Sequence, residues 1–245
     1  MPAAQQKVKT DRVLVVGASS GMGAALARQY AAAGSKVALL ARRLDALKTL
    51  ADEINRDAPE PRAHVYAHDV REYDKVPGLF RQILDDLGGL DLIVYASGTM
   101  IPGEIDEYNF AKDLEVIEVN LLGAVAWLDQ AATIFDKQGT GAILAISSVA
   151  GDRGRRAYPA YHTAKAGLTT FLESLRNRMS ARGVRILTVK PGFIDTPMTQ
   201  GTPGLFWLIS ADRAAEVMRQ SLQRTWLQTL YVPYRWGLVM LIIRL

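Results

Sequence analysis

Short apolar segments typical of buried strands alternate along the chain with segments of helical spacing. The predicted strands are Arg12–Val16, Lys36–Leu40, Ala63–Ala67, Asp91–Tyr95, Ala142–Ser147 and Val184–Val189. The predicted helices are Met22–Ala33, Leu44–Arg56, Tyr73–Leu87, Val119–Phe135 and Ala160–Ala181. This order predicts an α/β fold, in which a mostly parallel, doubly wound sheet of about seven strands carries helices on both faces.

No internal repeat, low-complexity tract or linker divides the 245 residues, so we expect one Rossmann-type domain over residues 1–245. Within it we expect a flexible N-terminal segment at residues 1–10, and a substrate loop with a C-terminal segment at residues 199–245. The absence of cysteine excludes disulfides and thiolate metal sites, and it fits a reducing compartment. The first residues, MPAAQQKVKTDR, lack the apolar run of a signal peptide, so we expect a cytoplasmic location.

The charge balance is mildly basic, with 29 Lys and Arg against 25 Asp and Glu and a formal charge of +4. Nucleic-acid binders usually concentrate basic residues in patches interleaved with aromatic residues. The mild excess seen here suits an anionic cofactor better, and we expect no nucleic-acid partner.

A glycine-rich turn, GASSGMG at residues 17–23, follows the first strand and opens the first helix. Glycines let the backbone approach a pyrophosphate, which binds at the helix N-terminus because free N–H groups and the helix dipole favour anions. A turn that needs glycine only for tight packing is the alternative. The expected cofactor contacts in this turn are Gly17, Ser19, Ser20, Gly21, Met22 and Gly23.

The end of the second strand indicates which dinucleotide binds. An NAD site usually has a carboxylate there for the ribose hydroxyls, whereas this chain has Ala41, Arg42 and Arg43. An arginine fork binds phosphate in a bidentate manner, so we predict NADP(H) as the cofactor, with Arg42 on its 2′-phosphate. Ser19 or Ser20 would add a hydroxyl contact, and Arg43 is interpreted as a solvated residue at the start of a helix.

The segment YPAYHTAKAGL at residues 158–168 places Tyr161 and Lys165 one helical turn apart on the same face. Tyr158 has His162 at the same offset and is separated from Tyr161 by Pro159, a usual first-turn residue. Tyr161 and Lys165 are therefore the candidate chemical pair. His162 is predicted to lie on the helix surface, because its face differs from that of Tyr161.

Together these features resemble the short-chain dehydrogenase/reductase family over nearly the whole chain. The matching segments are GASSGMG at 17–23, Asp69-Val70, Asn120 in VNLLG, Ser148 in ISSVAG, Tyr161-x-x-x-Lys165 and Pro191-Gly-Phe-Ile-Asp-Thr196. Ser148 precedes Tyr161 by thirteen residues, the interval in many family members, which favours it over Ser147. After the fourth strand the chain departs from the family, with Tyr95-Ala96-Ser97-Gly98 in place of the usual Asn-Asn-Ala-Gly.

The resemblance implies a catalytic set of Asn120, Ser148, Tyr161 and Lys165. Tyr161 is the proton donor to the developing alkoxide, Ser148 hydrogen-bonds the substrate oxygen, and Lys165 is expected to lower the tyrosine pKa from about 10. Asn120 is expected to hold a water for a proton relay. The further cofactor contacts implied are Asp69, Val70, Gly98, Tyr161, Lys165, Pro191, Gly192, Ile194 and Thr196. The family also implies a homodimer or a homotetramer.

The substrate end is less informative. An apolar cluster in GTPGLFWLIS at 201–210 and the apolar run Trp236–Ile243 suit an apolar substrate. The run is too short to span a membrane, which takes about 20 residues, and it would pack in a core or subunit interface, cover a substrate, or lie on a membrane surface. The arginines of Asp152–Arg156 would either meet an anionic substrate or form a solvated loop.

The function predicted from sequence is an NADP(H)-dependent dehydrogenase or reductase acting on a small carbonyl or secondary alcohol substrate. A membrane-peripheral reductase of a lipid-like substrate is one alternative. An NADP(H)-binding regulatory protein without turnover is the other, although such a protein would not need the proton donor at Tyr161.

Overall fold

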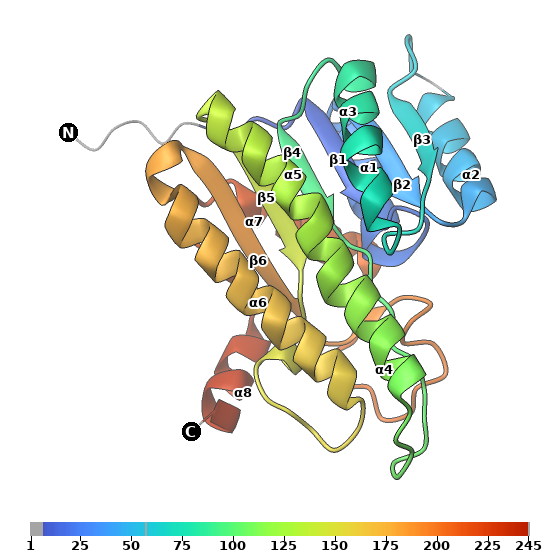
Figure 1. Cartoon of the computed structure of the whole chain (residues 1–245), viewed down its shortest axis with the longest axis vertical. Coiled ribbons are helices and arrows are strands. Elements are labelled where there is room, and N and C mark those ends of the chain that lie inside the picture. The colour runs from blue at the N-terminus through green and yellow to red at the C-terminus, as the bar shows by residue number, and fades with distance from the viewer. Residues whose placement is uncertain (1–6, 57, 245) are drawn as a thin grey trace.

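The computed structural model describes residues 7–56 and 58–244 and centres on one seven-stranded sheet (Figure 1). The strands are β1 (Arg12–Val16), β2 (Lys36–Ala41), β3 (Ala63–Ala67), β4 (Leu92–Tyr95), β5 (Gly141–Ile146), β6 (Val184–Pro191) and β9 (Thr229–Val232). Their order is β3-β2-β1-β4-β5-β6-β9, and every neighbouring pair is parallel. The predicted doubly wound α/β fold is confirmed.

Eight α-helices connect or follow these strands in the described residues. They are α1 (Gly21–Ala32), α2 (Leu44–Asn55), α3 (Val76–Leu87), α4 (Phe110–Ile117), α5 (Gly123–Gln138), α6 (Pro159–Met179), α7 (Ala211–Leu222) and α8 (Arg235–Arg244). The predicted helix Tyr73–Leu87 instead begins with a 3-10 turn, because Pro77 lies in the first turn of α3 and helices commonly start at such a proline. The predicted helix from Val119 begins in a π-helical turn, Glu118–Leu122, that joins α4 to α5.

Both faces of the sheet are covered by helices. Along β1, Val13 and Val15 belong to a core shared with α1, α2 and α7, whereas Leu14 and Val16 belong to a core shared with α3, α5 and α6. This alternation follows from the two-residue repeat of a strand, and all four side chains are fully buried, as in a parallel sheet covered on both sides. Figure 1 shows α3, α5 and α6 across the near face.

The strand order creates the crevice in which a ligand can bind. Because β1 lies between β2 and β4, the connections that leave the carboxyl ends of β1 and β4 run in opposite directions across the sheet. Ligands of open α/β sheets bind where such connections separate. The candidate site residues follow the strands at this edge.

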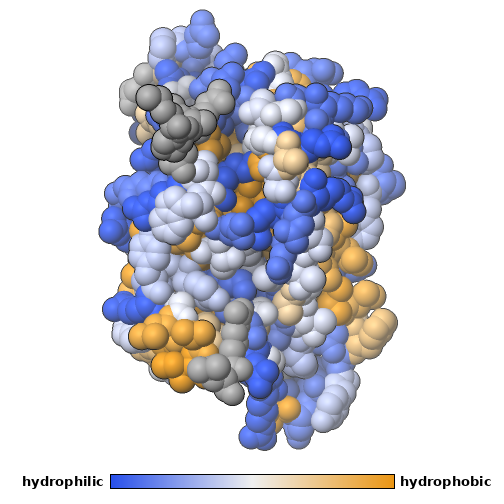
Figure 2. Space-filling model, turned by 90° about the vertical axis from the view of Figure 1, so that its left-hand side faces the viewer, coloured by the Kyte–Doolittle hydropathy of each residue, from blue (hydrophilic) through white to orange (hydrophobic). Residues whose placement is uncertain are grey.

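The C-terminal helix α8 buries one side and exposes the other. Trp236 and Met240 pack against Val149, while Leu238, Leu241 and Ile242 are each more than half exposed. Apolar side chains accordingly gather around the C-terminal end of the chain in Figure 2. None of the helices in the described part of the chain is long and apolar enough to cross a membrane.

The expected flexible segment at residues 1–10 falls largely on residues 1–6, which lie outside the described residues. At Val8 the described chain is hydrogen-bonded to Gln223, the residue that follows α7. Its backbone N–H donates to Gln223 Oε1 at 2.9 Å, and its carbonyl accepts from Gln223 Nε2 at 3.1 Å.

Candidate active site

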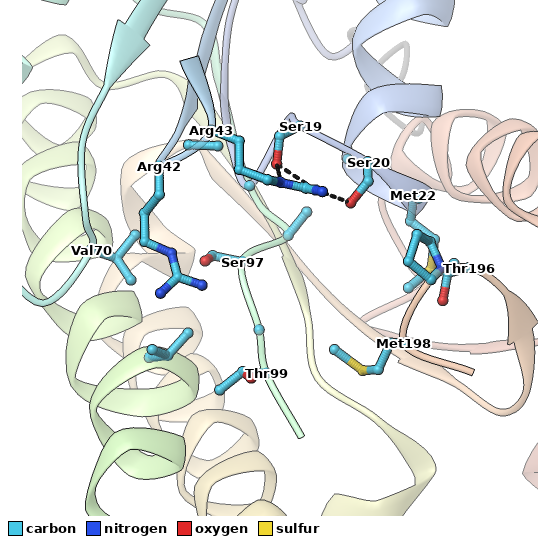
Figure 3. Close-up of a pocket in the computed structure, with 18 of the residues that line it drawn as sticks. Ser19, Ser20, Met22, Arg42, Arg43, Val70, Ser97, Thr99, Thr196 and Met198 are labelled. Carbon is cyan, nitrogen blue, oxygen red and sulfur yellow. Dashed lines mark hydrogen bonds between the residues drawn. The ribbon is translucent and has the colours of Figure 1, made fainter. Parts of the chain in front are cut away.

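A cavity of about 470 Å³ lies at the carboxyl ends of β1, β2 and β4 (Figure 3). Ten of the residues predicted to bind the cofactor line it: Gly17, Ser19, Ser20, Gly21, Met22, Gly23, Arg42, Val70, Gly98 and Thr196. Asp69 is not part of this lining, and Arg71 Nη2 donates to its carboxylate at 2.7 Å. That hydrogen bond is the main reason why the pKa of Asp69 lies below its usual value.

The glycine-rich turn combines tight packing with an uncapped helix N-terminus. Gly17 has φ +93°, and a Cβ there or at Gly23 would overlap neighbouring backbone, so compactness alone already demands glycine at these positions. The N-terminus of α1 adds a second property. Its N-cap, Ser20, makes no side-chain capping bond, and the first turn holds no acidic residue. First-turn N–H groups without a side-chain cap are suited to an anion in the adjoining cavity.

Two guanidinium groups line this cavity. Arg42 extends into it beside Val70 and Ser97 in Figure 3, and its Nη1 lies 3.9 Å from Asp69 Oδ2. Arg43 was interpreted from the sequence as a solvated residue. It is exposed, but it also lines the cavity and donates from Nη2 to the hydroxyls of Ser19 at 3.0 Å and Ser20 at 2.7 Å.

A second cavity, of about 310 Å³, adjoins the first and brings together Ser148, Tyr161 and Lys165. Ser148 follows β5, while Tyr161 and Lys165 lie on the first two turns of α6. The two cavities share Met22, Ala96, Gly98, Met100, Thr196 and Met198 in their linings. The predicted chemical residues therefore lie next to the predicted phosphate-binding turn.

Lys165 is buried, and its Nζ donates to the carbonyl of Ile146 at 3.0 Å. Burial lowers the pKa of Lys165 to about 8. Its Nζ lies 5.6 Å from the centre of the Tyr161 ring. Burial raises the pKa of Tyr161, and a hydrogen bond with Ser148 opposes that change only in part. The causes of the raised tyrosine pKa are thus burial and, in the opposite direction, Ser148, and the expected lowering by Lys165 is not among them.

Asn120 is fully buried in the π-helical turn between α4 and α5. Its Nδ2 donates to the carbonyls of Thr99 and Val116, both at 2.8 Å, whereas its Oδ1 is a buried acceptor without a hydrogen-bond partner among the described residues. A Cβ built on Gly98 would lie 2.9 Å from Asn120 Oδ1 and 3.5 Å from Lys165 Nζ. Both polar groups therefore border the same narrow space beside Gly98.

The departure from the family motif after β4 has a structural counterpart. Tyr95 is fully buried, and its hydroxyl donates to the carbonyl of Val119 at 2.7 Å, in the turn that carries Asn120. Burial raises the pKa of Tyr95, which keeps the phenol neutral as a donor. Gly98 keeps the close approach that a glycine permits. The end of β4 is thus tied to the Asn120 turn by a phenol instead of by asparagine amides.

His162 does not lie on the helix surface, contrary to the sequence prediction. It is 8% exposed, lines the second cavity, and binds the carbonyl of Ala150 through Nδ1 at 2.7 Å. The reason is a tertiary contact, since the start of α6 packs against the 3-10 turn Val149–Gly151. Tyr158, the residue before α6, also lines this cavity, and it has φ +59°, a conformation that is uncommon for a residue other than glycine.

The last residue of β6, Pro191, and the loop after it border the second cavity, the loop with Gly192, Ile194 and Thr196. Thr199 braces it, because its hydroxyl donates to the Ile194 carbonyl at 2.6 Å and accepts from the Thr196 N–H at 3.2 Å. Sequence reasoning did not identify Thr199, nor Met100 and Met198, which line both cavities. A lone threonine or methionine in a loop carries no sequence signal for such a position.

Comparisons with known proteins agree with this geometry. A family model described as short chain dehydrogenase matches residues 11–203. An uncharacterized oxidoreductase of Mycobacterium tuberculosis is 31% identical over 218 residues, covering 89% of this chain and 86% of its own length. One of Staphylococcus epidermidis is 30% identical over 196 residues, covering 80% and 83% of the two chains.

Among solved structures, an alcohol dehydrogenase from the archaeon Thermococcus sibiricus, complexed with 5-hydroxy-NADP, is similar with a TM-score of 0.81 and 25% identity. The alignment covers 91% of this chain and 96% of that one. A short-chain type dehydrogenase/reductase from Mycobacterium marinum has a TM-score of 0.81 at 24% identity, covering 92% and 94% of the two chains, which supports the fold.

Proposed function

The chain belongs to the short-chain dehydrogenase/reductase family of nicotinamide-dependent oxidoreductases, and from that premise we propose that it is an NADP(H)-dependent reductase or dehydrogenase of a carbonyl or secondary alcohol substrate. The observation that carries the proposal is the convergence of Ser148, Tyr161 and Lys165 on one cavity that adjoins the glycine-rich turn. Each residue in this set supplies one function that the reaction requires.

The first cavity fits the cofactor in shape and charge. The uncapped N-terminus of α1 would receive the pyrophosphate, and Arg42 would bind the 2′-phosphate, with Arg43 and the two serines of the turn beside it. No carboxylate is found among the described residues that line this cavity, so nothing in the lining would repel the extra phosphate. The Thermococcus sibiricus enzyme, whose bound ligand is an NADP derivative, supports the same choice.

The bound cofactor would supply or accept the hydride, and four side chains would handle the accompanying proton: Asn120, Ser148, Tyr161 and Lys165. The Ser148 hydroxyl would donate a hydrogen bond to the substrate oxygen, and Tyr161 would give that oxygen its proton in the reductive direction. A neutral phenol, which burial favours here, is the required donor form.

The tyrosine must then recover its proton. Lys165 Nζ and Asn120 Oδ1 border one narrow space beside Gly98, and the amide oxygen still has its acceptor capacity. In the reductive direction the Lys165 ammonium would return a proton to the tyrosinate, and a water held between Lys165 Nζ and Asn120 Oδ1 would bring a proton from solvent to the amine that is left. A lysine whose pKa lies at about 8 gives up a proton more readily at neutral pH than an ordinary lysine does.

A regulatory NADP(H)-binding protein without turnover is the second candidate. It accounts for the first cavity, but it gives no purpose to the buried Lys165 or to Asn120 Oδ1, which has no hydrogen-bond partner in the described part of the chain. Burying such groups without a function would cost stability.

Turnover separates the two candidates. The purified protein is expected to oxidise NADPH in the presence of members of a panel of ketones and aldehydes, seen as loss of the nicotinamide absorbance. Tight NADPH binding with no carbonyl reduction across the panel, and no alcohol oxidation with NADP⁺, would favour the regulatory role.

We also expect a homo-oligomer, because Leu238, Leu241 and Ile242 leave one side of α8 uncovered and a second copy of the chain would cover it. Sedimentation at micromolar concentration should give a dimer or tetramer, and Leu241→Arg should shift it toward the monomer. Leu44→Arg serves as the control, because Leu44 starts α2, which lies across the molecule from α8 in Figure 1. A monomeric protein that binds to lipid vesicles through α8 would contradict this expectation and support the lipid-like substrate.

A further inference from the structure

We infer that the substrate of the proposed reaction carries an oxyanion, a carboxylate or a phosphate, on an apolar body, and that Arg155 binds this group. The inference depends on the proposed function for the location of the reacting carbonyl. It goes beyond that function because it names the substrate class and a specificity-determining residue outside the catalytic set.

The charges on the second cavity point to an anion. Among the described residues that line it, Lys165 and Arg155 are the lysine and arginine side chains, and none of the lining residues is a carboxylate. Most of the remaining lining is apolar; it includes Met100, Val149, Phe193, Ile194, Met198 and Leu205. The proposed proton relay accounts for Lys165, whereas Arg155 has no part in it.

Arg155 lines the second cavity but not the first. It belongs, with Ala157 and Tyr158, to the part of the lining that is not shared with the first cavity. An anion bound there would contact a different arginine from the pair that lines the cofactor cavity. Arg155 would thus contact the far end of a substrate whose carbonyl lies between Ser148 and Tyr161.

The loop that carries Arg155 keeps its positive charge uncompensated. Its only acidic residue, Asp152, turns inward: its side chain is buried, pairs with Lys190, and accepts a hydrogen bond from the Tyr231 hydroxyl at 2.8 Å. Arg153, Arg155 and Arg156 are exposed, and within the described chain none of them forms an ion pair or a hydrogen bond. Asp152 is therefore not part of a solvated loop. Its contacts with Lys190 on β6 and Tyr231 on β9 fix the start of the loop to the sheet.

The exit of the loop is also fixed. Tyr158 is held with φ +59°, and Pro159 starts α6 directly after it. A restricted backbone on one side and a buried ion pair on the other limit the positions that Arg155 can take. An arginine on a loop that is fixed at both ends loses less backbone freedom when it binds an oxyanion than one on a freely moving loop would.

Matched pairs of ketones test the inference. We would compare para-acetylbenzoate with its methyl ester, levulinate with methyl levulinate, and para-acetylphenyl phosphate with para-acetylphenyl methyl ether. For the wild type, kcat/KM for the anionic member should exceed that for its neutral partner by about 10- to 100-fold, the effect of a hydrogen bond to a charged group. Comparing the benzoate with the phosphate then identifies which oxyanion the site prefers.

Arg155→Ala should reduce this preference to within about threefold, mainly through KM, and Arg155→Lys should keep part of it. The matched control is Arg153→Ala, which removes an equally exposed arginine of the same loop that does not line the cavity and should leave the preference unchanged. High salt should weaken the preference in the wild type, because exposed charges are screened.

Calorimetric titration of para-acetylbenzoate and its ester into the protein with NADP⁺ gives a second readout that needs no turnover. Tighter binding of the acid that is lost in Arg155→Ala supports the inference even if no ketone is reduced, in which case only the proposed function fails. If the neutral ketones are reduced but the anions are not preferred, or if Arg155→Ala keeps the preference, the inference is wrong and the proposed function stands.

Discussion

Tyr161→Phe is expected to lower kcat by about 10²- to 10⁴-fold, the usual contribution of a positioned general acid. Among the residues that line the second cavity, Tyr161 is the phenol that lies beside both Ser148 and Lys165. Phenylalanine keeps the ring that packs there and removes only the hydroxyl. Binding of NADPH, measured by calorimetry, should change by no more than about threefold, because the lost group acts in the chemical step.

Tyr158→Phe is the matched control for this prediction. Tyr158 lines the same cavity and is also a phenol, but it stands at the N-cap of α6 and is 37% exposed. Its loss should reduce kcat by less than about fivefold. If the two variants lose activity to a similar degree, Tyr161 is not the proton donor.

The direction of the tyrosine pKa illustrates what a sequence pattern cannot supply. Spacing alone placed Tyr161 and Lys165 on one face of a helix, which α6 bears out. Whether the lysine lowers the pKa of the phenol depends on burial and on the partner of its ammonium group, here the Ile146 carbonyl. Both depend on residues from β5 that are distant in sequence.

The strands were predictable because they are buried on both faces and therefore consist of continuous apolar residues. Six of the seven strands of the sheet were predicted to within two residues at each end. The strand missed, β9, is a four-residue edge strand next to the aromatic tail. Helix α4 was missed for another reason: α4, the π-helical turn and α5 follow one another without a break, and the π turn interrupts the helical spacing of apolar residues.

In the candidate site, the residues that belong to motifs could be identified from the sequence, whereas the contacts of neighbouring residues such as His162 and Arg43 could not. The glycine-rich turn, Ser148, Tyr161 and Lys165 come together as their order along an α/β chain requires. The burial of His162 and the contact of Arg43 with the turn serines both arise from tertiary packing. Neither residue has a spacing or a composition around it that marks such a contact.

The second large effect concerns the cofactor. The wild type should prefer NADPH to NADH by about 10- to 150-fold in kcat/KM, because hydrogen bonds to a charged group contribute about 1.5–3 kcal/mol and each 1.4 kcal/mol is a factor of ten. Arg42 extends into the cavity and is about half exposed, so water screens part of its interaction with a phosphate. Ala41, at the end of β2, also lines the cavity and leaves room there without adding a negative charge.

Ala41→Asp combined with Arg42→Ala should reverse the preference toward NADH, because the new carboxylate repels the 2′-phosphate and can accept bonds from the ribose hydroxyls. Both substitutions lie at the end of β2, outside the lining of the second cavity, so kcat with NADH should stay close to that of the wild type.

Arg43→Ala alone separates the roles of the two arginines. It removes the contacts with Ser19 and Ser20, and it should weaken NADPH binding by less than Arg42→Ala does. The measurement is kcat/KM for both cofactors with one accepted carbonyl. A wild type that uses NADH as well as NADPH would show that the strand end does not select the phosphate, and a larger loss in Arg43→Ala would transfer the phosphate contact to Arg43.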